Sequence, residues 1–380
     1  MSLGAAAAGD EPEIVADIAG AAVMPDYEGG WLGDVLPALQ AGRAPLGAPA
    51  WVAGAPQRVV LLIDGLGWDM YRRFGEWLPS LAPFEASTIT SVVPSTTASA
   101  LPTLTTGLPP AVHGMLGDRM RVGGRVLSVL QWTVAEGTPP EPSKVQPHRP
   151  FPGGPVEVVS HAKFAGSGFS AAHLRGGRYH GFETATELVE RVGACVDAGA
   201  PIVYAYLPDL DRTAHEHGMA HDAFGQALAL ADDVVSSVHR RLPRGAAMLV
   251  TADHGQVTTN VAERVDLRPL DGMVSAMGGS TRLRYLHARP GASADLLAAA
   301  TELAGAHAWV HDRDSLIATG WMGPTMHPVV AGRLGDVVLA ARGAATIVDP
   351  ADRRQAELVT MHGSVSAEEV LVPLLAVRGG

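Results

Sequence analysis

The sequence predicts an α/β fold organised around a doubly wound, mostly parallel sheet, because three apolar runs alternate with helix-like segments. The runs are 59–63 (VVLLI), 201–207 (PIVYAYL) and 246–251 (AAMLVT), and an acidic residue follows each of them closely. Short uncharged runs of this kind are typical of strands buried on both faces of a parallel sheet. Functional sites in such sheets gather beyond the carboxyl ends of the strands, where these acidic residues stand.

Helices are expected between the runs, where apolar residues recur at helical spacing. The apolar positions are Leu188, Val189 and Val192 in segment 184–198, and Leu228, Ala231, Val234, Val235 and Val238 in segment 220–241. Another strand-like run, STITSVV at 87–93, leads to hydroxyl residues at which a helix is expected to begin. Pro102 falls inside that helix and should kink it or limit it to short turns.

Two stretches interrupt this alternation. Residues 119–180 include GTPPEPSKVQPHRPFPGGP, which is too rich in Pro and Gly for a core element and indicates a surface lobe. Residues 261–335 combine short strand-like runs with an Ala-rich helix at 291–304. We therefore expect a main domain over 51–380 with cap-like insertions at about 119–180 and 261–335. Residues 1–50 are expected to form an N-terminal extension that packs on the core.

Composition limits the class of partner. The chain has 380 residues, 47% of them hydrophobic, and a net charge of −11. This charge disfavours nucleic acid as a main partner, because phosphate backbones require basic patches. Bound divalent cations would offset acidic residues locally, so a small phosphorylated substrate stays open. The one cysteine, Cys195, excludes an internal disulfide, favours a reducing compartment, and lies in an apolar helix-like segment that indicates a buried, inert thiol.

The sequence also bears on location. The first residues, MSLGAAAAGDEPE, lack the basic and apolar segments of a secretion signal. No stretch approaches the roughly 18 consecutive apolar residues that a membrane-spanning helix needs. We therefore expect a soluble, cytoplasmic protein without a membrane partner, and the sequence leaves the oligomeric state open.

Metal-capable and nucleophilic residues stand at the ends of the predicted strands. Asp64 follows the first run and is followed by Gly65, so it either binds a metal or opens an Asp-Gly turn. Ser95, Thr96 and Thr97 stand where a helix would begin. Hydroxyl residues there commonly cap the helix, but a metal-bound hydroxyl at the same place would become a nucleophile.

Three further sites supply histidines. Asp211 and His215 are one helical turn apart, so both can face one metal, although a solvated polar loop is an equal alternative. Asp253 and His254 are adjacent and followed by Gly255, which allows an irregular turn through which both could reach one cation. His362 stands alone near the carboxyl end, and a single histidine is usually structural or exposed.

Together these motifs resemble the alkaline phosphatase superfamily, in particular its type I phosphodiesterase/nucleotide pyrophosphatase branch. The matching pieces are IDG at 63–65, PSTT with TLTTGLPP at 94–110, DRTAHEHG at 211–218, ADHG at 252–255 and HGS at 362–364. Five pieces in the correct order are far more specific than any one of them. The resemblance implies a three-layer α/β/α sandwich that carries two divalent metal ions, usually zinc.

The resemblance also implies a role for each residue. Asp64, Thr97, Asp253 and His254 would hold one metal, and Asp211, His215 and His362 the other. Thr97 would attack phosphorus and form a covalent phospho-threonine intermediate, which water then hydrolyses. Zinc is favoured because three ligands are histidines, although the carboxylates also suit manganese.

Several activities fit this resemblance. The leading expectation is a phosphodiesterase or nucleotide pyrophosphatase that acts on a small phosphorylated substrate. A phosphonate hydrolase would use nearly the same ligands, and so would a phosphomonoesterase, for which Arg119, Arg121, Arg175 and Arg178 could hold the extra phosphate charge. A non-catalytic metal-dependent ligand-binding protein is the alternative of another class. Its support is Ala100, which stands three residues after Thr97, where an asparagine that binds a phosphoryl oxygen is expected.

Overall fold

A computed structural model describes residues 22–349, 351 and 357–380 of the chain. The first 21 residues of the expected N-terminal extension therefore lie outside the described part. In the part that the structure does describe, no helix has the length and apolar character needed to cross a membrane.

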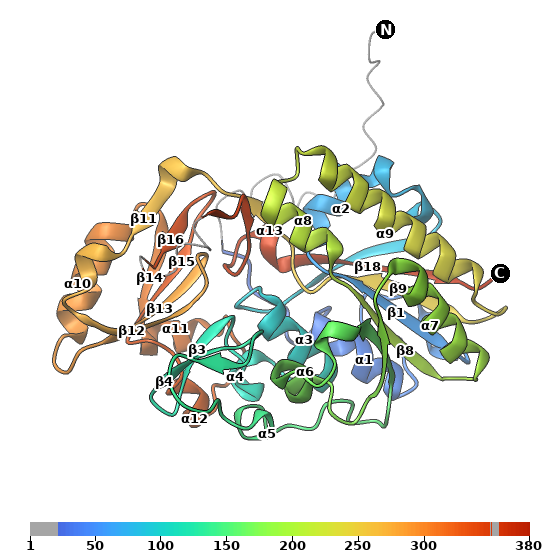
Figure 1. Ribbon diagram of the computed structural model, residues 1–380, viewed down its shortest axis with the longest axis horizontal. Coiled ribbons are helices and arrows are strands. Elements are labelled where there is room, and N and C mark those ends of the chain that lie inside the picture. The colour runs from blue at the N-terminus through green and yellow to red at the C-terminus, as the bar shows by residue number, and fades with distance from the viewer. Residues whose placement is uncertain (1–21, 350, 352–356) are drawn as a thin grey trace, which may run out of the picture.

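A seven-stranded sheet forms the centre of the molecule (Figure 1). Its order is β2 (Glu85–Thr90), β18 (Leu371–Arg378), β9 (Ala247–Thr251), β1 (Arg58–Ile63), β8 (Ile202–Leu207), β6 (Glu157–His161) and β7 (Arg178–Phe182). The strands from β9 to β7 pair in parallel, whereas β18 is antiparallel to both β9 and β2. β18 is thus the one strand of this sheet that runs against the others. The mostly parallel sheet predicted from the sequence is confirmed.

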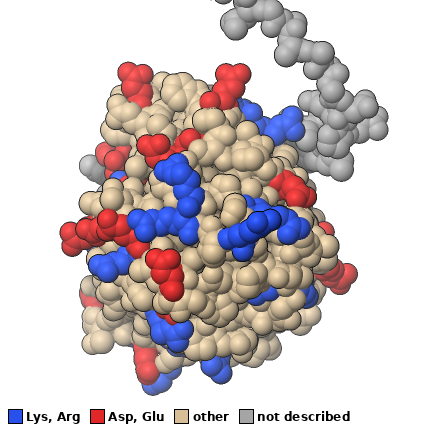
Figure 2. All heavy atoms as spheres, turned by 90° about the vertical axis from the view of Figure 1, so that its right-hand side faces the viewer, with Lys and Arg blue, Asp and Glu red and all other residues tan. Residues whose placement is uncertain are grey.

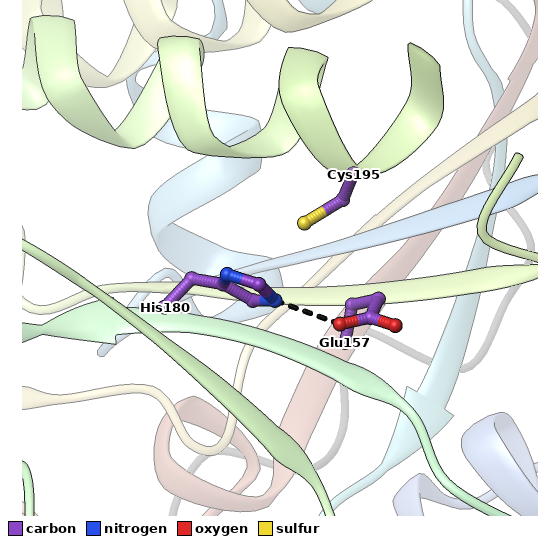
Figure 3. A group of neighbouring side chains, drawn as sticks. All are labelled: Glu157, His180 and Cys195. Carbon is purple, nitrogen blue, oxygen red and sulfur yellow. Dashed lines mark hydrogen bonds and ion pairs between the residues drawn. The ribbon is translucent and has the colours of Figure 1, made fainter. Parts of the chain in front are cut away.

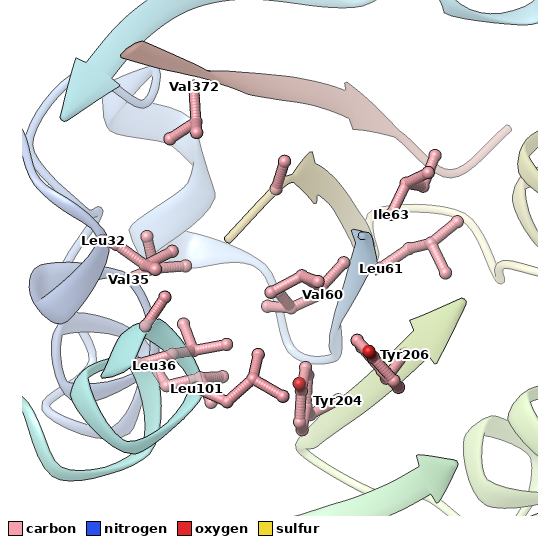
Figure 4. Close-up of a cluster of buried hydrophobic side chains, with 14 of the residues drawn as sticks. Leu32, Val35, Leu36, Val60, Leu61, Ile63, Leu101, Tyr204, Tyr206 and Val372 are labelled. Atoms are coloured by element: carbon pink, nitrogen blue, oxygen red, sulfur yellow. The ribbon is translucent and has the colours of Figure 1, made fainter. Parts of the chain in front are cut away.

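Helices cover both faces of this sheet and complete the expected three-layer α/β/α sandwich (Figure 1). One face carries α7 (Ala185–Asp197) and α9 (Asp222–Arg240), and the other carries α1 (Leu32–Gln40), α3 (Thr97–Thr106) and α6 (Gly168–His173). Figure 4 shows Leu36 of α1 and Leu101 of α3 close to Val60 of β1, with all three side chains buried. Burying apolar side chains on both faces of β1 explains its uninterrupted apolar sequence.

The predicted helices agree with the structure. The five apolar positions proposed for segment 220–241 are all buried in α9, and Leu188 and Val192 are buried in α7. Cys195 is also buried in α7, as expected. The helix α3 continues through Pro102 to Thr106, so it is not limited to short turns, and the predicted kink stays a prediction. Backbone carbonyls near the proline have side-chain partners, since the Thr105 and Thr106 hydroxyls donate to the Leu101 and Pro102 carbonyls.

The first expected insertion, 119–180, is only partly a lobe. It does include the small sheet of β3 (Arg119–Val122), β4 (Arg125–Ser128) and β5 (Thr133–Val134), and the short helix α5 (Pro142–Val145). However, β6 and the start of β7 belong to the central sheet. The short run EVVSH of β6 carries a charge at its start and gives a weak strand signal, and the neighbouring Pro/Gly-rich segment obscured it.

The second expected insertion, 261–335, contributes to a separate lobe with its own apolar core. A four-stranded antiparallel sheet runs in the order β12 (Val274–Gly279), β13 (Leu283–Ala288), β15 (Val337–Ala341) and β14 (Ala308–Asp312), with α10 (Ser293–Ala304) packed on it. β15 lies beyond the expected boundary at residue 335. Two helices, α11 (Arg313–Thr319) and α12 (Pro328–Ala331), and the pair β11 (Arg264–Asp266) and β16 (Thr346–Val348) belong to the same region of the chain.

The remaining short elements connect these layers. They include α2 (Trp68–Arg73), α4 (Pro110–His113), α8 (Asp209–His217), α13 (Ala367–Val370) and the two-stranded sheet of β10 (Val257–Thr258) and β17 (Thr360–Met361). On the face of the molecule that Figure 2 shows, basic and acidic side chains are interspersed.

A buried ion pair joins the lobe to the central body. Arg282, next to β13, pairs with Glu369 of α13 at 2.8 Å, and both side chains are fully buried. Glu369 also accepts hydrogen bonds from the Ser364 backbone N–H and the Ser366 hydroxyl. A buried carboxylate with this many donors depends on all of them, because water cannot replace a partner that is removed.

We expect Arg282→Met to lower the free energy of unfolding by about 3–5 kcal/mol, since it leaves the Glu369 carboxylate buried without its counter-charge. Urea unfolding followed by circular dichroism would measure the loss. The matched control is Arg73→Met, which breaks the exposed Arg73–Asp69 pair and should cost less than about 1 kcal/mol. Equal effects of the two changes would contradict the structural role of the buried pair.

Candidate metal centre

The seven residues proposed from the sequence converge at the carboxyl edge of the parallel strands. Asp64 follows β1, Asp253 and His254 follow β9, and Asp211 and His215 lie on α8, directly after β8. Thr97 is the first residue of α3, and His362 follows β17. The ring centroids of His254 and His362 lie 3.5 Å apart, and those of His215 and His362 lie 5.1 Å apart.

One set of atoms surrounds His254. Its Nε2 lies 3.1 Å from Thr97 Oγ1, 3.4 Å from Asp253 Oδ2 and 3.5 Å from Asp64 Oδ1. The other oxygen of each carboxylate accepts hydrogen bonds. Asp253 Oδ1 accepts them from the backbone N–H groups of Gly65 and His254, and Asp64 Oδ2 accepts one from the Tyr206 hydroxyl. The inward oxygens, Asp64 Oδ1 and Asp253 Oδ2, are buried and have no hydrogen-bond partner among the described residues.

This pattern fits a cation. Two buried carboxylate oxygens without donors would be costly in a site that stayed empty of positive charge. Oxygen and imidazole nitrogen atoms are suitable zinc or manganese ligands, and here they face one point from rigid elements. Ligand atoms of Asp64, Asp253 and His254 all lie within 4.8 Å of one another, as do those of Asp211, His254 and His362.

The second set of atoms surrounds Asp211. Its Oδ1 lies 3.4 Å from His215 Nε2 and 3.8 Å from His362 Nε2. The helical spacing of four brings Asp211 and His215 to one face of α8, as the sequence predicts. His362, which alone gave no signal, reaches the same point from the far end of the chain.

The three histidines make the same type of hydrogen bond to the backbone. Each has Nδ1 directed at a backbone carbonyl: Gly255 for His254, Thr360 for His215 and Ser95 for His362. A proton held on Nδ1 by a carbonyl leaves the lone pair of Nε2 for a metal, which is the usual arrangement of metal-binding histidines. All three Nε2 atoms accordingly face the carboxylates.

Electrostatics support the same interpretation. Burial raises the pKa of Asp64 well above its usual range, and the charges of Asp253 and Asp211 raise it further. Burial also lowers the pKa of His362, together with the neighbouring histidines. Without a cation the site therefore favours a protonated Asp64 carboxyl and a neutral His362 imidazole, and a cation bound between them would favour the ionised carboxylate instead.

Two glycines allow this close packing. Gly65 has φ of +75°, and a Cβ there would lie 2.5 Å from Gln256 Nε2. A Cβ on Gly255 would lie 1.9 Å from the Glu368 carbonyl oxygen. Any other residue at either position would displace the turn that carries Asp64 or the turn that carries His254.

Sequence reasoning missed three residues of this centre. Tyr206 supports Asp64 from the last part of β8, and Gln256 donates to Asp211 Oδ1 while it accepts from the Thr360 hydroxyl. Asp118 precedes β3, and its charge interacts with His254, His215 and Asp211; burial raises the pKa of Asp118 to about 6. Tyr206 lies inside an apolar run, and neither Gln256 nor Asp118 has a partner close in sequence. Their roles could not be found from local patterns.

A cavity of about 220 Å³ opens beside Thr97. Asp64, Thr97 and Asp211 form its metal-side wall. Its other walls are mainly apolar and aromatic, from Leu101, Leu130, Phe164, Phe169, Leu174, Tyr204 and Tyr206, with Lys163 and Arg212 as the cationic side chains among the described lining residues. The Tyr204 hydroxyl is buried and has no hydrogen-bond partner among the described residues. The cavity thus suits a compact organic group next to the threonine hydroxyl.

The sequence matches the type I phosphodiesterase/nucleotide pyrophosphatase family over residues 58–187 and 182–365. The chain belongs to this family. The family is metal-dependent, and its members hydrolyse phosphoester-type bonds, so the chain is a hydrolase. A comparison with curated protein sequences gives no match.

Solved structures agree with the family fold. Murine ectonucleotide pyrophosphatase/phosphodiesterase 5 superposes with a TM-score of 0.67 at 16% identity, covering 84% of this chain and 87% of that one. An inactive variant of the murine protein has been solved in complex with AMP. Phosphonoacetate hydrolase from Sinorhizobium meliloti 1021, in complex with phosphonoformate, gives a TM-score of 0.62 at 16% identity, covering 85% of this chain and 90% of that one.

We expect Asp64→Asn to stabilise the metal-free protein at pH 8 relative to wild type. Folding raises the pKa of the Asp64 carboxyl, so the protonated carboxyl favours the folded state. This contribution to stability is lost as pH rises through the raised pKa and the carboxyl ionises. An asparagine at this position cannot ionise and therefore avoids the loss. The same change should reduce the stabilisation by zinc, which for wild type is about 2.7 kcal/mol at a hundredfold excess over the dissociation constant.

Thermal unfolding with chelator and with zinc measures both effects. Asp209→Asn is the control, because Asp209 lies on α8 with Asp211 but pairs with Arg212 at the surface. A metal-free Asp64→Asn protein less stable than wild type at pH 8 would contradict this account of the site.

Proposed function

We propose that the chain hydrolyses a phosphodiester or phosphoanhydride bond in a small molecule, with the Thr97 hydroxyl as nucleophile. The observation that carries the proposal is the convergence of Asp64 Oδ1, Asp253 Oδ2 and Thr97 Oγ1 on His254 Nε2 in a buried site. We assign Asp64, Thr97, Asp253 and His254 to one divalent cation, and Asp211, His215 and His362 to a second. When bound, the cations would supply positive charge that favours the ionised hydroxyl and offsets charge on the phosphoryl and leaving oxygens.

The chain itself positions the nucleophile. Thr97 is the first residue of α3, so its hydroxyl lies at the positive end of the helix dipole, which stabilises an alkoxide and a phosphoryl anion. As Oγ1 bonds to phosphorus, the bond from phosphorus to the leaving oxygen breaks, and the hydroxyl proton ends on the leaving group. Water then cleaves the Thr97 phosphoester, which releases the second product and restores the hydroxyl.

The cavity supports an ester with an organic substituent as substrate. Phe164, Phe169 and Leu101 offer an apolar surface, and Tyr204 offers a hydroxyl to one polar atom of that substituent. Lys163 and Arg212 favour an anionic substrate.

A phosphomonoesterase receives less support from the arginines that the sequence offered for the extra phosphate charge. Three of the arginines proposed for this task have other partners. Arg119 pairs with Asp349, Arg178 pairs with Glu157, and Arg175 donates to the backbone carbonyls of Ala172 and Gln146. None of the three is among the described residues that line the cavity. A phosphonate hydrolase stays a second candidate, because the phosphonoacetate hydrolase shares the fold.

We expect Thr97→Ala to lower kcat for bis-p-nitrophenyl phosphate by a factor of at least about a thousand, since it removes the atom that attacks phosphorus. Thr96→Ala is the matched control and should keep most of the activity, because the Thr96 hydroxyl has no hydrogen-bond partner among the described residues. Release of p-nitrophenol in zinc or manganese measures both. Full activity of Thr97→Ala would exclude the covalent mechanism. Acid quench of wild type during this reaction should trap a p-nitrophenyl phosphoryl group bound to Thr97.

The cavity makes a separate prediction about substrates. Phe164→Ala should raise KM for aryl and nucleotide diesters by roughly tenfold, at little cost in kcat, because it removes contact with the substituent rather than with phosphorus. A methyl ester of the same phosphate should show no such change. Phe74→Ala, which removes a ring that packs on Phe224 of α9, is the control for a general effect on the fold. Steady-state kinetics over a panel of diesters, monoesters and phosphonates would reveal the preferred class.

A further inference from the structure

A second group of metal-capable side chains lies at the opposite edge of the central sheet. Glu157 is the first residue of β6, His180 is the third residue of β7, and Cys195 lies near the end of α7 (Figure 3). β6 and β7 run parallel to β8, and Glu157 pairs with Val203 near the start of that strand. The catalytic candidates instead follow the ends of β1, β8 and β9. The two groups are therefore separated by the length of the strands.

The three side chains are close enough to share one ion. A carboxylate oxygen of Glu157, a ring nitrogen of His180 and Cys195 Sγ lie within 4.8 Å of one another. His180 Nε2 is 2.7 Å from Glu157 Oε2, and Figure 3 shows the Cys195 side chain directed from α7 toward this pair. The Cys195 residue is 5% exposed, whereas the His180 side chain is 36% exposed, so the group is buried on one side and open on the other.

A neighbouring arginine orients the Glu157 carboxylate, and a surface cavity gives solvent access to the three side chains. Arg178 pairs with the other oxygen of Glu157, Oε1, and thereby orients the carboxylate without occupying Oε2. A surface cavity of about 290 Å³ is lined by Glu157, His180 and Cys195 together with Arg178 and Arg191. This cavity leaves room for a fourth ligand from solvent.

We propose that Glu157, His180 and Cys195 form a peripheral binding site for a zinc-type cation, with the fourth position open to the cavity. Thiolate, imidazole and carboxylate are all zinc ligands, and three protein ligands with one open position is a common zinc arrangement. Binding converts the Cys195 thiol to a thiolate and releases one proton. The thiolate and the carboxylate then neutralise the two positive charges of the ion, which leaves a neutral complex beside Arg178 and Arg191.

The site would fasten α7 to an edge of the sheet. β7 is the last strand of the central sheet and pairs only with β6 among the described strands. An ion held by β6, β7 and α7 links all three elements and stabilises the folded state in proportion to its occupancy. This inference does not depend on the proposed function, because the two groups share no residue.

The single cysteine makes the test specific. Cys195 is the one cysteine in the chain, and the catalytic candidates include no sulfur, so a thiolate-to-metal charge-transfer band reports the peripheral site alone. We expect titration of the full-length, metal-free protein with Cd²⁺ or Co²⁺ to produce this band with one equivalent bound at that site. Zinc should remove the band by competition. It should also slow the reaction of Cys195 with dithiobis(nitrobenzoate) by about tenfold or more, and chelator should restore the rate.

Variants separate the two sites. Cys195→Ser should abolish the band, and His180→Gln should weaken cadmium binding by about tenfold or more. Asp211→Asn, which removes a ligand of the other centre, should leave the band unchanged. Arg191→Gln, which changes a cavity residue that is not a ligand, is the control for a general effect on this surface. Absence of the band in wild type at saturating Cd²⁺, or its persistence in Cys195→Ser, would overturn the proposal and leave Glu157, Arg178 and His180 as an ion-pair network only.

Discussion

The mutual repulsion of buried carboxylates at the carboxyl edge of the sheet is the constraint on which the site depends. Asp64, Asp253 and Asp211 are brought together by three parallel strands whose ends necessarily meet at one edge. The chain supports one oxygen of Asp64 and one of Asp253 with hydrogen bonds and leaves the other inward, toward the histidines. Bound cations would stabilise these carboxylates by offsetting their negative charge. The same positive charge would stabilise the negative oxygens of a phosphoryl group.

Rigid packing around the site maintains that arrangement. The loop that carries His362 is held by Ser95 on one side and leads to Glu369 on the other, whose ion pair with Arg282 reaches into the lobe. Through this connection the smaller antiparallel sheet contributes to the position of a candidate ligand, although the lobe supplies none of the seven residues itself. The lobe therefore helps to hold the loop that carries His362 in place.

The sequence predicted the parallel sheet and the helices α7 and α9 because these elements depend on local periodicity. It predicted Asp211 with His215 for the same reason, since one helical turn relates them. Their assembly with Thr97 and His362 could be expected only from the resemblance, because contacts between distant segments leave no local pattern. Tyr206, Gln256 and Asp118 show this limit most clearly: each acts through a neighbour that is far away in sequence. β6 was missed because its charged first residue and the Pro/Gly-rich segment before it concealed a short strand.

The position of β18 has a consequence for how the candidate site is held together. This last strand lies between β9 and β2, so β2 joins the sheet chiefly through it, and β2 leads directly to the threonine at the start of α3. Without β18 the parallel strands could still pair with one another, but β2 and the loop that leads from it to Thr97 would lose their main anchor on the sheet. The distance between Thr97 and the other candidate ligands is therefore fixed by a strand that carries none of them.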